Sequence, residues 1–295
     1  MIKNFLITGD THGGMATISR VSNIARNVPD CKPEKTGIII LGDSGLNFWL
    51  NNTDKKYKKT LNDMGYHIYC VRGNHEERPE NIPGMVLLTE DEDVGNAVWF
   101  QEEFPNIRYF VDGNAYNIGG HSVLVIGGAY SVDKWYRLAR AGYSPAEAET
   151  ANPKKCGWFK DELLTEKEMI AITKECEGKH FDFVLSHTCP LSWEPTDLFL
   201  RGIDQSQVDK SMEFWLDELR HHVDWHVWLF GHYHADRIER PRVEQMYMDY
   251  ENIDTIWNRW FDKKTYEKEW WLPRSSYMKW FDECKEGSQW TSGIT

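Results

Sequence analysis

Short, nearly continuous apolar runs recur along the chain. Six of them occupy residues 5–7, 37–41, 67–71, 122–126, 181–185 and 226–230. Apolar runs of this kind, without strict alternation with polar residues, are typical of strands buried on both faces. We therefore predict six core strands at these positions.

Helical patterns lie between several of these runs. Residues 16–28 connect the first two, and residues 211–222 precede the last with Phe214, Trp215 and Leu219 at helical spacing. Strands that alternate with helices predict an α/β fold in which ligands bind on the loops beyond the strand ends.

The organisation of the chain changes in two places. Residues 137–176 contain Pro145, Pro153 and a cluster of charges, which indicates a long insertion near the site, with a helix after Thr165. From residue 241 onward the aromatic content rises. We predict one domain over residues 1–240, followed by an extension over residues 241–295 that packs on the same domain.

The extension holds six of the fourteen tryptophans, mixed with Lys and Glu. Trp257 and Trp260 are three residues apart, which places them on one face of a helix against the core. We favour packing or a subunit contact for this segment, since aromatic side chains bury a large area. A surface that stacks single-stranded bases or a lid over the substrate is the less favoured alternative.

The composition of the chain argues against two kinds of partner. The chain of 295 residues carries 34 basic and 46 acidic side chains, a net charge of -12, which disfavours nucleic acid as a partner without excluding it. No run reaches the ~18 apolar residues of a membrane span, so no membrane partner is expected.

The location is expected to be cytoplasmic. The amino terminus is interpreted as the first strand rather than a signal peptide, because cleavage would remove Asp10, a predicted ligand. Six cysteines without Cys-x-x-Cys spacing fit a reducing compartment. Nothing in the pattern fixes the oligomeric state.

Candidate chemistry lies at five strand ends. The stretches are Gly9-Asp10-Thr11-His12-Gly13, Gly42-Asp43, Gly73-Asn74-His75-Glu76, His187 and Gly231-His232-Tyr233-His234. A single Asp-x-His is common, whereas all five in this order, each after an apolar run, form a specific pattern. Two metal ions can generate a nucleophile near neutral pH and neutralise phosphoryl charge, and they need a carboxylate that can bridge them plus several neutral donors.

These stretches resemble the motifs of calcineurin-like metallophosphoesterases, over residues 8 to 234. The resemblance implies a four-layer αββα sandwich of two mixed β-sheets flanked by helices, with a dinuclear metal site at the strand ends. It also implies two divalent ions, for which mixed Asp, His and Asn donors favour manganese, with iron or zinc as alternatives.

The resemblance implies a role for each motif residue. One ion would be held by Asp10, His12 and His234. The other would be held by Asn74, His187 and His232. Asp43 would bridge the two ions and hold a reactive hydroxide, and His75 would be the catalytic histidine that binds the phosphate or protonates the leaving oxygen.

The chain departs from the protein-phosphatase branch after Asp43. Leu46 stands where an Asp would orient the catalytic histidine, and Asn47 stands where an Arg would bind the phosphate. The block from Gly127 to Lys134 with Arg137, followed by Trp158 and Glu162, instead resembles small bacterial and phage-borne members.

We predict substrate contacts by Asn47, Arg72 and Arg137. Arg137 or Lys134 could supply the missing phosphate contact, because Arg pairs bidentately with phosphate. Arg72 could equally form an ion pair behind the site, and Glu76 is expected to support the site without binding metal.

The predicted function is hydrolysis of phosphoesters by a dinuclear metal site, with a phosphomonoesterase favoured. Its partner would be a phosphorylated small molecule or a phosphoprotein. The alternative within enzymes is a phosphodiesterase or nuclease acting on nucleotides or nucleic acid. The alternative outside enzymes is a non-catalytic scaffold that binds partners through the extension, and the complete ligand set argues against it.

Overall fold

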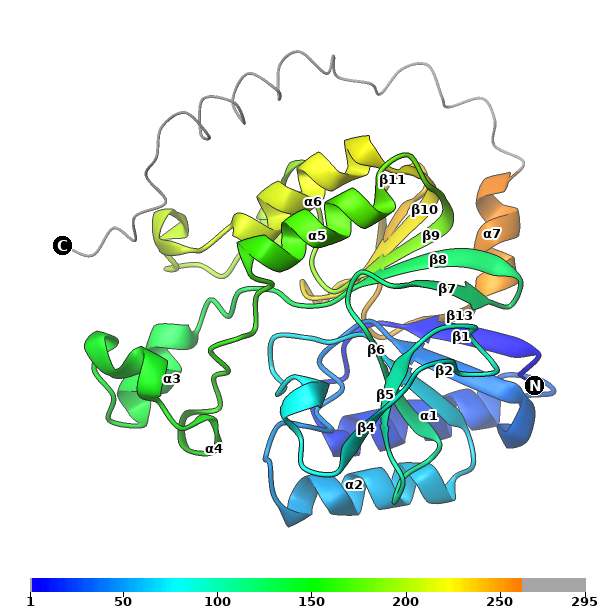
Figure 1. Cartoon of the computed structure of the whole chain (residues 1–295), viewed down its shortest axis with the longest axis horizontal. Helices are drawn as coiled ribbons and strands as arrows, with labels where there is room; N and C mark the ends of the chain where they lie inside the picture. The colour runs from blue at the N-terminus through cyan, green and yellow to red at the C-terminus, as the bar shows by residue number, and fades with distance from the viewer. Residues whose placement is uncertain (1, 262–295) are drawn as a thin grey trace.

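The computed structural model describes residues 2–261, which form two β-sheets packed face to face between helices (Figure 1). The later part of the predicted extension, with Trp270, Trp271, Trp280 and Trp290, lies outside the described residues.

Both sheets are mixed. The first has the order β13 (Tyr250–Asn252), β1 (Asn4–Thr8), β2 (Thr36–Ile40), β3 (His67–Cys70), β6 (Ile107–Phe110), β5 (Val98–Gln101) and β4 (Met85–Leu88). The second has the order β11 (Arg237–Arg240), β12 (Val243–Gln245), β10 (Asp224–Phe230), β9 (His180–Ser186), β8 (His121–Ile126) and β7 (Ala115–Ile118). Neighbours pair in parallel in the middle of each sheet and antiparallel toward its edges. The six predicted strands are all present as β1, β2, β3, β8, β9 and β10.

Alternating side chains divide the core into layers. On β1, Phe5 and Ile7 point between the two sheets, while Leu6 points outward and packs against the first pair of helices. These helices are α1 (Gly14–Asn27) and α2 (Asn52–Asp63). On the second sheet the outward-facing residues pack against α5 (Glu166–Cys176) and α6 (Ser211–His222). The predicted four-layer αββα sandwich is confirmed, with α1 and α2 below and α5 and α6 above in Figure 1.

The start of the predicted extension is part of the sandwich. β13 pairs with β1, and helix α7 (Ile253–Phe261) follows it at the edge of both sheets (orange in Figure 1). Ile256 and Trp260 are buried in the core between the sheets, and Trp257 packs against it. The indole of Trp260 also donates a hydrogen bond to Glu244. The helix predicted from Trp257 and Trp260 is therefore present and faces the core.

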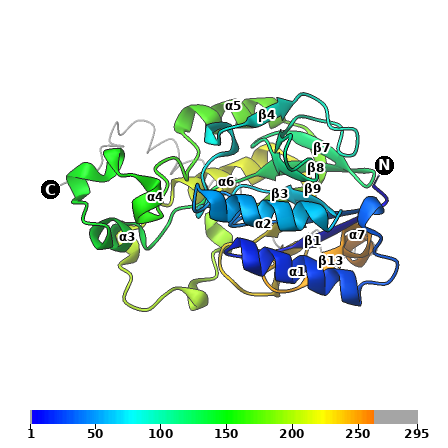
Figure 2. The same ribbon diagram turned by 90° about the horizontal axis from the view of Figure 1, so that it is seen from below.

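The segment predicted as an insertion has two parts. Helices α3 (Lys134–Arg140) and α4 (Pro153–Cys156) form a lobe with its own apolar cluster of Leu138, Ala148, Cys156 and Trp158. This lobe projects from one end of the molecule (left in Figures 1 and 2). The predicted helix after Thr165 is α5, which is capped by Thr165 and Glu168 and lies in the outer layer of the sandwich.

Connections in the described part include six short 3-10 helices. They are Pro33–Lys35, Pro79–Asn81, Pro145–Thr150, Leu191–Trp193, Thr196–Leu198 and Gln205–Gln207. Within residues 2–261, no helix combines the length and apolar character needed to cross a membrane.

Replacing Trp260 with Ala should lower the free energy of unfolding by about 3–5 kcal/mol, because it empties a buried site in the core between the sheets. The matched control is Phe261→Ala, since Phe261 is its half-exposed neighbour and should cost less than about 1 kcal/mol. Urea unfolding of both variants measures the difference. Equal losses would mean that α7 does not contribute to the core.

Candidate metal centre

The direction of the central strands places the predicted ligands at the same end of both sheets. The central strands of each sheet are parallel, so their carboxyl ends and the loops that follow lie at the same end. The five motifs follow β1, β2, β3, β9 and β10. The centre is thus built from both sheets.

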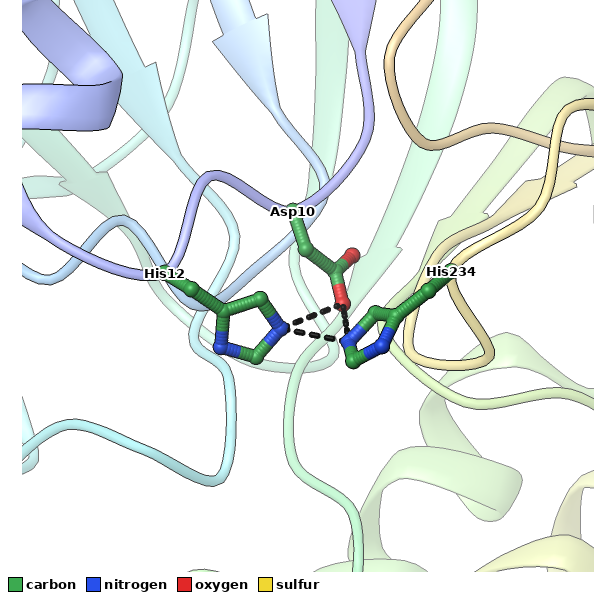
Figure 3. Close-up of side chains that lie close together, drawn as sticks. All are labelled: Asp10, His12 and His234. Carbon is green, nitrogen blue, oxygen red and sulfur yellow. Dashed lines mark hydrogen bonds and ion pairs between the residues drawn. The ribbon is translucent and has the colours of Figure 1, made fainter. Parts of the chain in front are cut away.

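Asp10, His12 and His234 form the first cluster (Figure 3). The Nε2 atoms of His12 and His234 lie 2.5 Å apart, and each lies 3.6 Å from Oδ2 of Asp10. Asp10 is buried and held in place by the backbone N–H of His232, 2.9 Å from both carboxylate oxygens. Two ring nitrogens and a carboxylate oxygen thus converge on one point.

Asn74 and His187 form the second cluster. Oδ1 of Asn74 lies 2.8 Å from Nε2 of His187, and both side chains are fully buried. His232 lies beside them, with its ring 5.1 Å from that of His187 in an edge-to-face arrangement. Burial, followed by the nearby His187, lowers the pKa of His232 well below its ordinary value, so this ring is neutral and able to act as a ligand.

Asp43 lies between the two clusters. Its Oδ2 is 3.5 Å from Nδ1 of His12 and 3.7 Å from Nε2 of His187, and this buried atom has no hydrogen-bond partner. Its Oδ1 accepts from the backbone N–H of His75 at 2.8 Å. Burial alone would raise the pKa of Asp43, but His187, His75 and His12 lower it below its ordinary value. A buried, ionised oxygen without a partner is a costly feature unless a cation lies near it.

The tautomer of His187 tests whether these donors fit a cation. Nδ1 of His187 lies 2.7 Å from the carbonyl oxygen of Leu41, which can only accept, so Nδ1 carries the proton. In the neutral ring Nε2 then presents a lone pair, and it faces the amide oxygen of Asn74, another acceptor. Two acceptors at 2.8 Å repel each other, and a divalent cation near both would make the contact favourable. The donor set fits a metal ion.

The backbone at the predicted ligands is strained. Seven residues other than glycine have positive φ in the described part, and four of them are His12, Asp43, His232 and His234. A left-handed conformation costs roughly 1–2 kcal/mol for an ordinary residue. Strain of this kind persists where the surrounding structure fixes it, typically at functional sites. Its concentration at these ligands is a second, independent mark of the centre.

His75 lies next to both clusters. Its ring centroid is 5.5 Å from that of His12, and burial lowers its pKa below the ordinary value, with Asp43 opposing the shift. Its Nδ1 is buried without a hydrogen-bond partner. Leu46, at the position of the orienting Asp of the protein-phosphatase branch, is buried in the core beneath α1 and α2 and offers no polar atom to this ring. Burial therefore favours the neutral form of His75, and the nearby Asp43 favours its protonated form.

The three predicted substrate contacts have different environments. Arg137 affects the pKa values of His12 and His75, so its charge lies close to the centre; it pairs with Asp133 at 2.6 Å. Arg72 is 3% exposed and donates to Asp112, Glu162 and Gly127. Asn47 is buried, and its Oδ1 accepts from Lys58 at 2.6 Å. Arg72 and Asn47 would have to leave these partners to touch a substrate, and the substrate role of all three residues stays a prediction.

Several supporting residues hold the loops. Glu76 accepts from the hydroxyl of Ser44 at 2.7 Å and from the backbone N–H of Gly73 at 2.9 Å, which agrees with its expected supporting role. Ser131 accepts from the amide of Asn74 at 2.8 Å and was not assigned a role from the sequence. The resemblance marked its block but gave no signal for this contact, because the two residues are 57 positions apart.

The fold and the site together define a metal-dependent hydrolase built on a two-sheet α/β sandwich. The family model of calcineurin-like phosphoesterases matches residues 3–236, so the chain belongs to the calcineurin-like phosphoesterase family. The protein is accordingly a metal-dependent hydrolase of phosphoesters, in a family that uses two metal ions.

Solved structures similar to the chain share little sequence with it. The protein TT1561 of Thermus thermophilus is 13% identical, with a TM-score of 0.41 over 85% of this chain and 98% of that one. The phosphopantetheinyl hydrolase from Mycobacterium tuberculosis is 12% identical, with a TM-score of 0.40 over 92% of this chain and 98% of that one. No curated protein matches the chain significantly.

Replacing Gly42 with Ala should disrupt the centre. A Cβ atom at this position would lie 2.0 Å from Nδ1 of His187 and would break its hydrogen bond to Leu41. Gly120→Ala is the matched control, because Gly120 also has positive φ but no atom within 4 Å of the added carbon. The control should lose about 1–2 kcal/mol of stability from strain alone.

Gly42→Ala should lose more stability than this control and should bind less metal. Urea unfolding and elemental analysis of bound metal measure the two effects. A Gly42→Ala protein that matches the control in both would contradict the described position of His187.

Proposed function

We propose that this enzyme is a phosphomonoesterase with two divalent metal ions. The seven ligands are the motif side chains that converge at the strand ends: Asp10, His12 and His234 for one ion, Asn74, His187 and His232 for the other, and Asp43 between them. The observation that carries this proposal is the buried Oδ2 of Asp43, which lies without a hydrogen-bond partner between the two clusters.

The donor set supports a borderline metal. Mixed imidazole, carboxylate and amide donors suit manganese, iron or zinc better than magnesium or calcium, and manganese is the ion that we favour. When bound, such ions supply an activated water and neutralise the phosphoryl oxygens.

His75 acts on the substrate beside the metal ligands. In its neutral form it can donate a hydrogen bond to a phosphoryl oxygen, and in its protonated form it can give a proton to the leaving oxygen. Arg137 lies close enough to affect the pKa of His75. A monoester carries more negative charge on its phosphoryl group than a diester does, so an added guanidinium favours the monoester. The substrate would be a phosphorylated small molecule or a phosphoprotein.

Two substitutions separate metal binding from catalysis. Asp43→Asn should abolish turnover and reduce bound metal, because the amide removes the charge between the clusters. His75→Ala should keep both ions and lower kcat by about 10²–10⁴-fold, the usual contribution of a group that transfers a proton in the transition state. Elemental analysis and turnover in the presence of Mn²⁺ measure both. Near-normal turnover in either variant would contradict the mechanism.

The lobe supports a second candidate, a phosphodiesterase acting on nucleotides. Residues 134–160 contain six basic and two acidic residues, against the acidic balance of the whole chain. Trp135 and Tyr136 on α3 are 45% and 66% exposed, and the amine of Lys134 lies 4.8 Å from the ring of Trp135. Exposed aromatic rings beside cations favour a base next to phosphate.

One assay separates the two candidates. It compares p-nitrophenyl phosphate with bis-p-nitrophenyl phosphate in Mn²⁺, with Asn74→Ala as the control for contaminating activity. Preference for the monoester is the expected result, and preference for the diester would replace the first candidate with the second. In that case, Trp135→Ala should raise KM for a nucleoside diester at least about fivefold. Ile170→Ala, at an exposed apolar residue on α5, should not raise it.

A further inference from the structure

A chain of hydrogen bonds lies behind the ligand Asn74. The amide nitrogen of Asn74 donates to Oγ of Ser131 at 2.8 Å, and this hydroxyl lies 2.5 Å from Oε2 of Glu162. The backbone N–H of Ser131 also donates to Oε1 of Glu162 at 3.1 Å. All three side chains are buried, so water does not compete for these contacts.

Glu162 sets which groups donate and which accept in this series of hydrogen bonds. When Glu162 is ionised, its carboxylate only accepts, so the hydroxyl of Ser131 donates to Glu162 and keeps its lone pairs for Asn74. The amide of Asn74 must then point its nitrogen toward Ser131 and its oxygen toward Nε2 of His187. An amide nitrogen has no lone pair for a metal, whereas the amide oxygen does. The direction of two hydrogen bonds thus decides whether Asn74 can be a ligand.

Arg72 anchors the position of Glu162. Its guanidinium donates to the carbonyl oxygen of Glu162 at 2.7 Å and pairs with Asp112 at 2.8 Å. Its own carbonyl accepts from the backbone N–H of Gly128 at 2.8 Å, in the loop that leads to Ser131. The loop after β3, the loop after β8 and the segment at Glu162 are therefore tied together behind the site. The ion pair of Arg72 has a structural purpose here that needs no substrate.

We propose that Ser131 and Glu162 are positioning residues that hold the amide oxygen of Asn74 toward the metal ion bound with His187. This inference rests on the proposed metal centre. It concerns the affinity of one of the two ions, because Asp10, His12 and His234 make no contact with this chain of hydrogen bonds in the described structure. Residues that orient a ligand typically contribute about 10–100-fold to metal affinity.

Three variants test the proposal. Ser131→Ala removes the acceptor of Asn74, and Ser131→Thr keeps a hydroxyl at the same place. Glu162→Gln is similar in shape but exchanges donor and acceptor. Its amide oxygen can still accept from the backbone N–H of Ser131, and its amide nitrogen then donates to the Ser131 hydroxyl. That hydroxyl is left to donate toward Asn74, which turns the amide nitrogen of Asn74 toward the metal.

The measurement is a calorimetric titration of the metal-free protein with Mn²⁺. Because burial raises the pKa of Glu162 to about 7, the titration is made at pH 8.5, where the carboxylate form dominates. The wild type should bind two ions. Ser131→Ala and Glu162→Gln should bind one ion as tightly as the wild type and the other about 10–100-fold more weakly. Ser131→Thr should restore the weaker affinity to within a few-fold of the wild type.

The control is Ser192→Ala. Ser192 also donates its hydroxyl to a carboxylate, that of Asp217 at 2.8 Å, but it is exposed and lies outside the metal centre. Ser192→Ala should leave the affinities for both Mn²⁺ ions unchanged. The Tm of its metal-free form measures the stability lost with an exposed hydrogen bond of this kind. Turnover against Mn²⁺ concentration provides a second readout, because excess Mn²⁺ should restore turnover of Ser131→Ala.

The outcomes are distinguishable. A wild type that binds two ions while Ser131→Ala binds both as tightly would overturn this inference alone. Equal weakening of both ions in Ser131→Ala, with a drop in Tm far beyond that of Ser192→Ala, would also overturn it, because the role would then be structural. A wild type that binds fewer than two ions would overturn the proposed function itself.

Discussion

The site depends on one physical constraint, which is that buried carboxylate, amide and imidazole groups converge and one carboxylate oxygen among them has no hydrogen-bond donor. That oxygen is Oδ2 of Asp43, and in the neutral form of His187 the lone pair of Nε2 also faces the amide oxygen of Asn74. Burying such groups costs several kcal/mol unless a positive charge lies near them. Binding of a cation to the folded state offsets this cost, so metal binding and stability of this edge are coupled.

The same constraint explains the backbone around the ligands. The side chains come from loops that follow strands of two different sheets, and these loops must turn sharply to aim them inward. Glycines allow the closest approaches, as where Gly42 passes His187 and Gly231 passes Asp10. Strain at residues such as His232 is the cost of this convergence, and the buried core on either side holds it in place.

The segment between β8 and α5 has two different parts. One is the lobe, and the other is the buried pair Ser131 and Glu162. Helix α3 carries Arg137, whose charge lowers the pKa of His75, and two exposed aromatic rings. Ser131 and Glu162 are buried, where Ser131 contacts the predicted ligand Asn74 and Glu162 accepts from Ser131. A single segment thus contains both an exposed lobe and a buried contact with a predicted metal ligand.

The sequence alone determined the central strands, and it predicted the ligand set. Buried parallel strands are continuous apolar runs, and the motif residues follow directly at their ends, so both signals are local. Edge strands such as β4 and β13 were not predicted, because half-exposed short strands have a mixed composition that resembles loops. Only the tertiary structure decided that Arg72 is buried against Asp112, that Asn47 faces Lys58, and that Ser131 contacts Asn74. These contacts join positions far apart in the chain, and their partners are set by packing of the two sheets and the lobe, which no local pattern encodes.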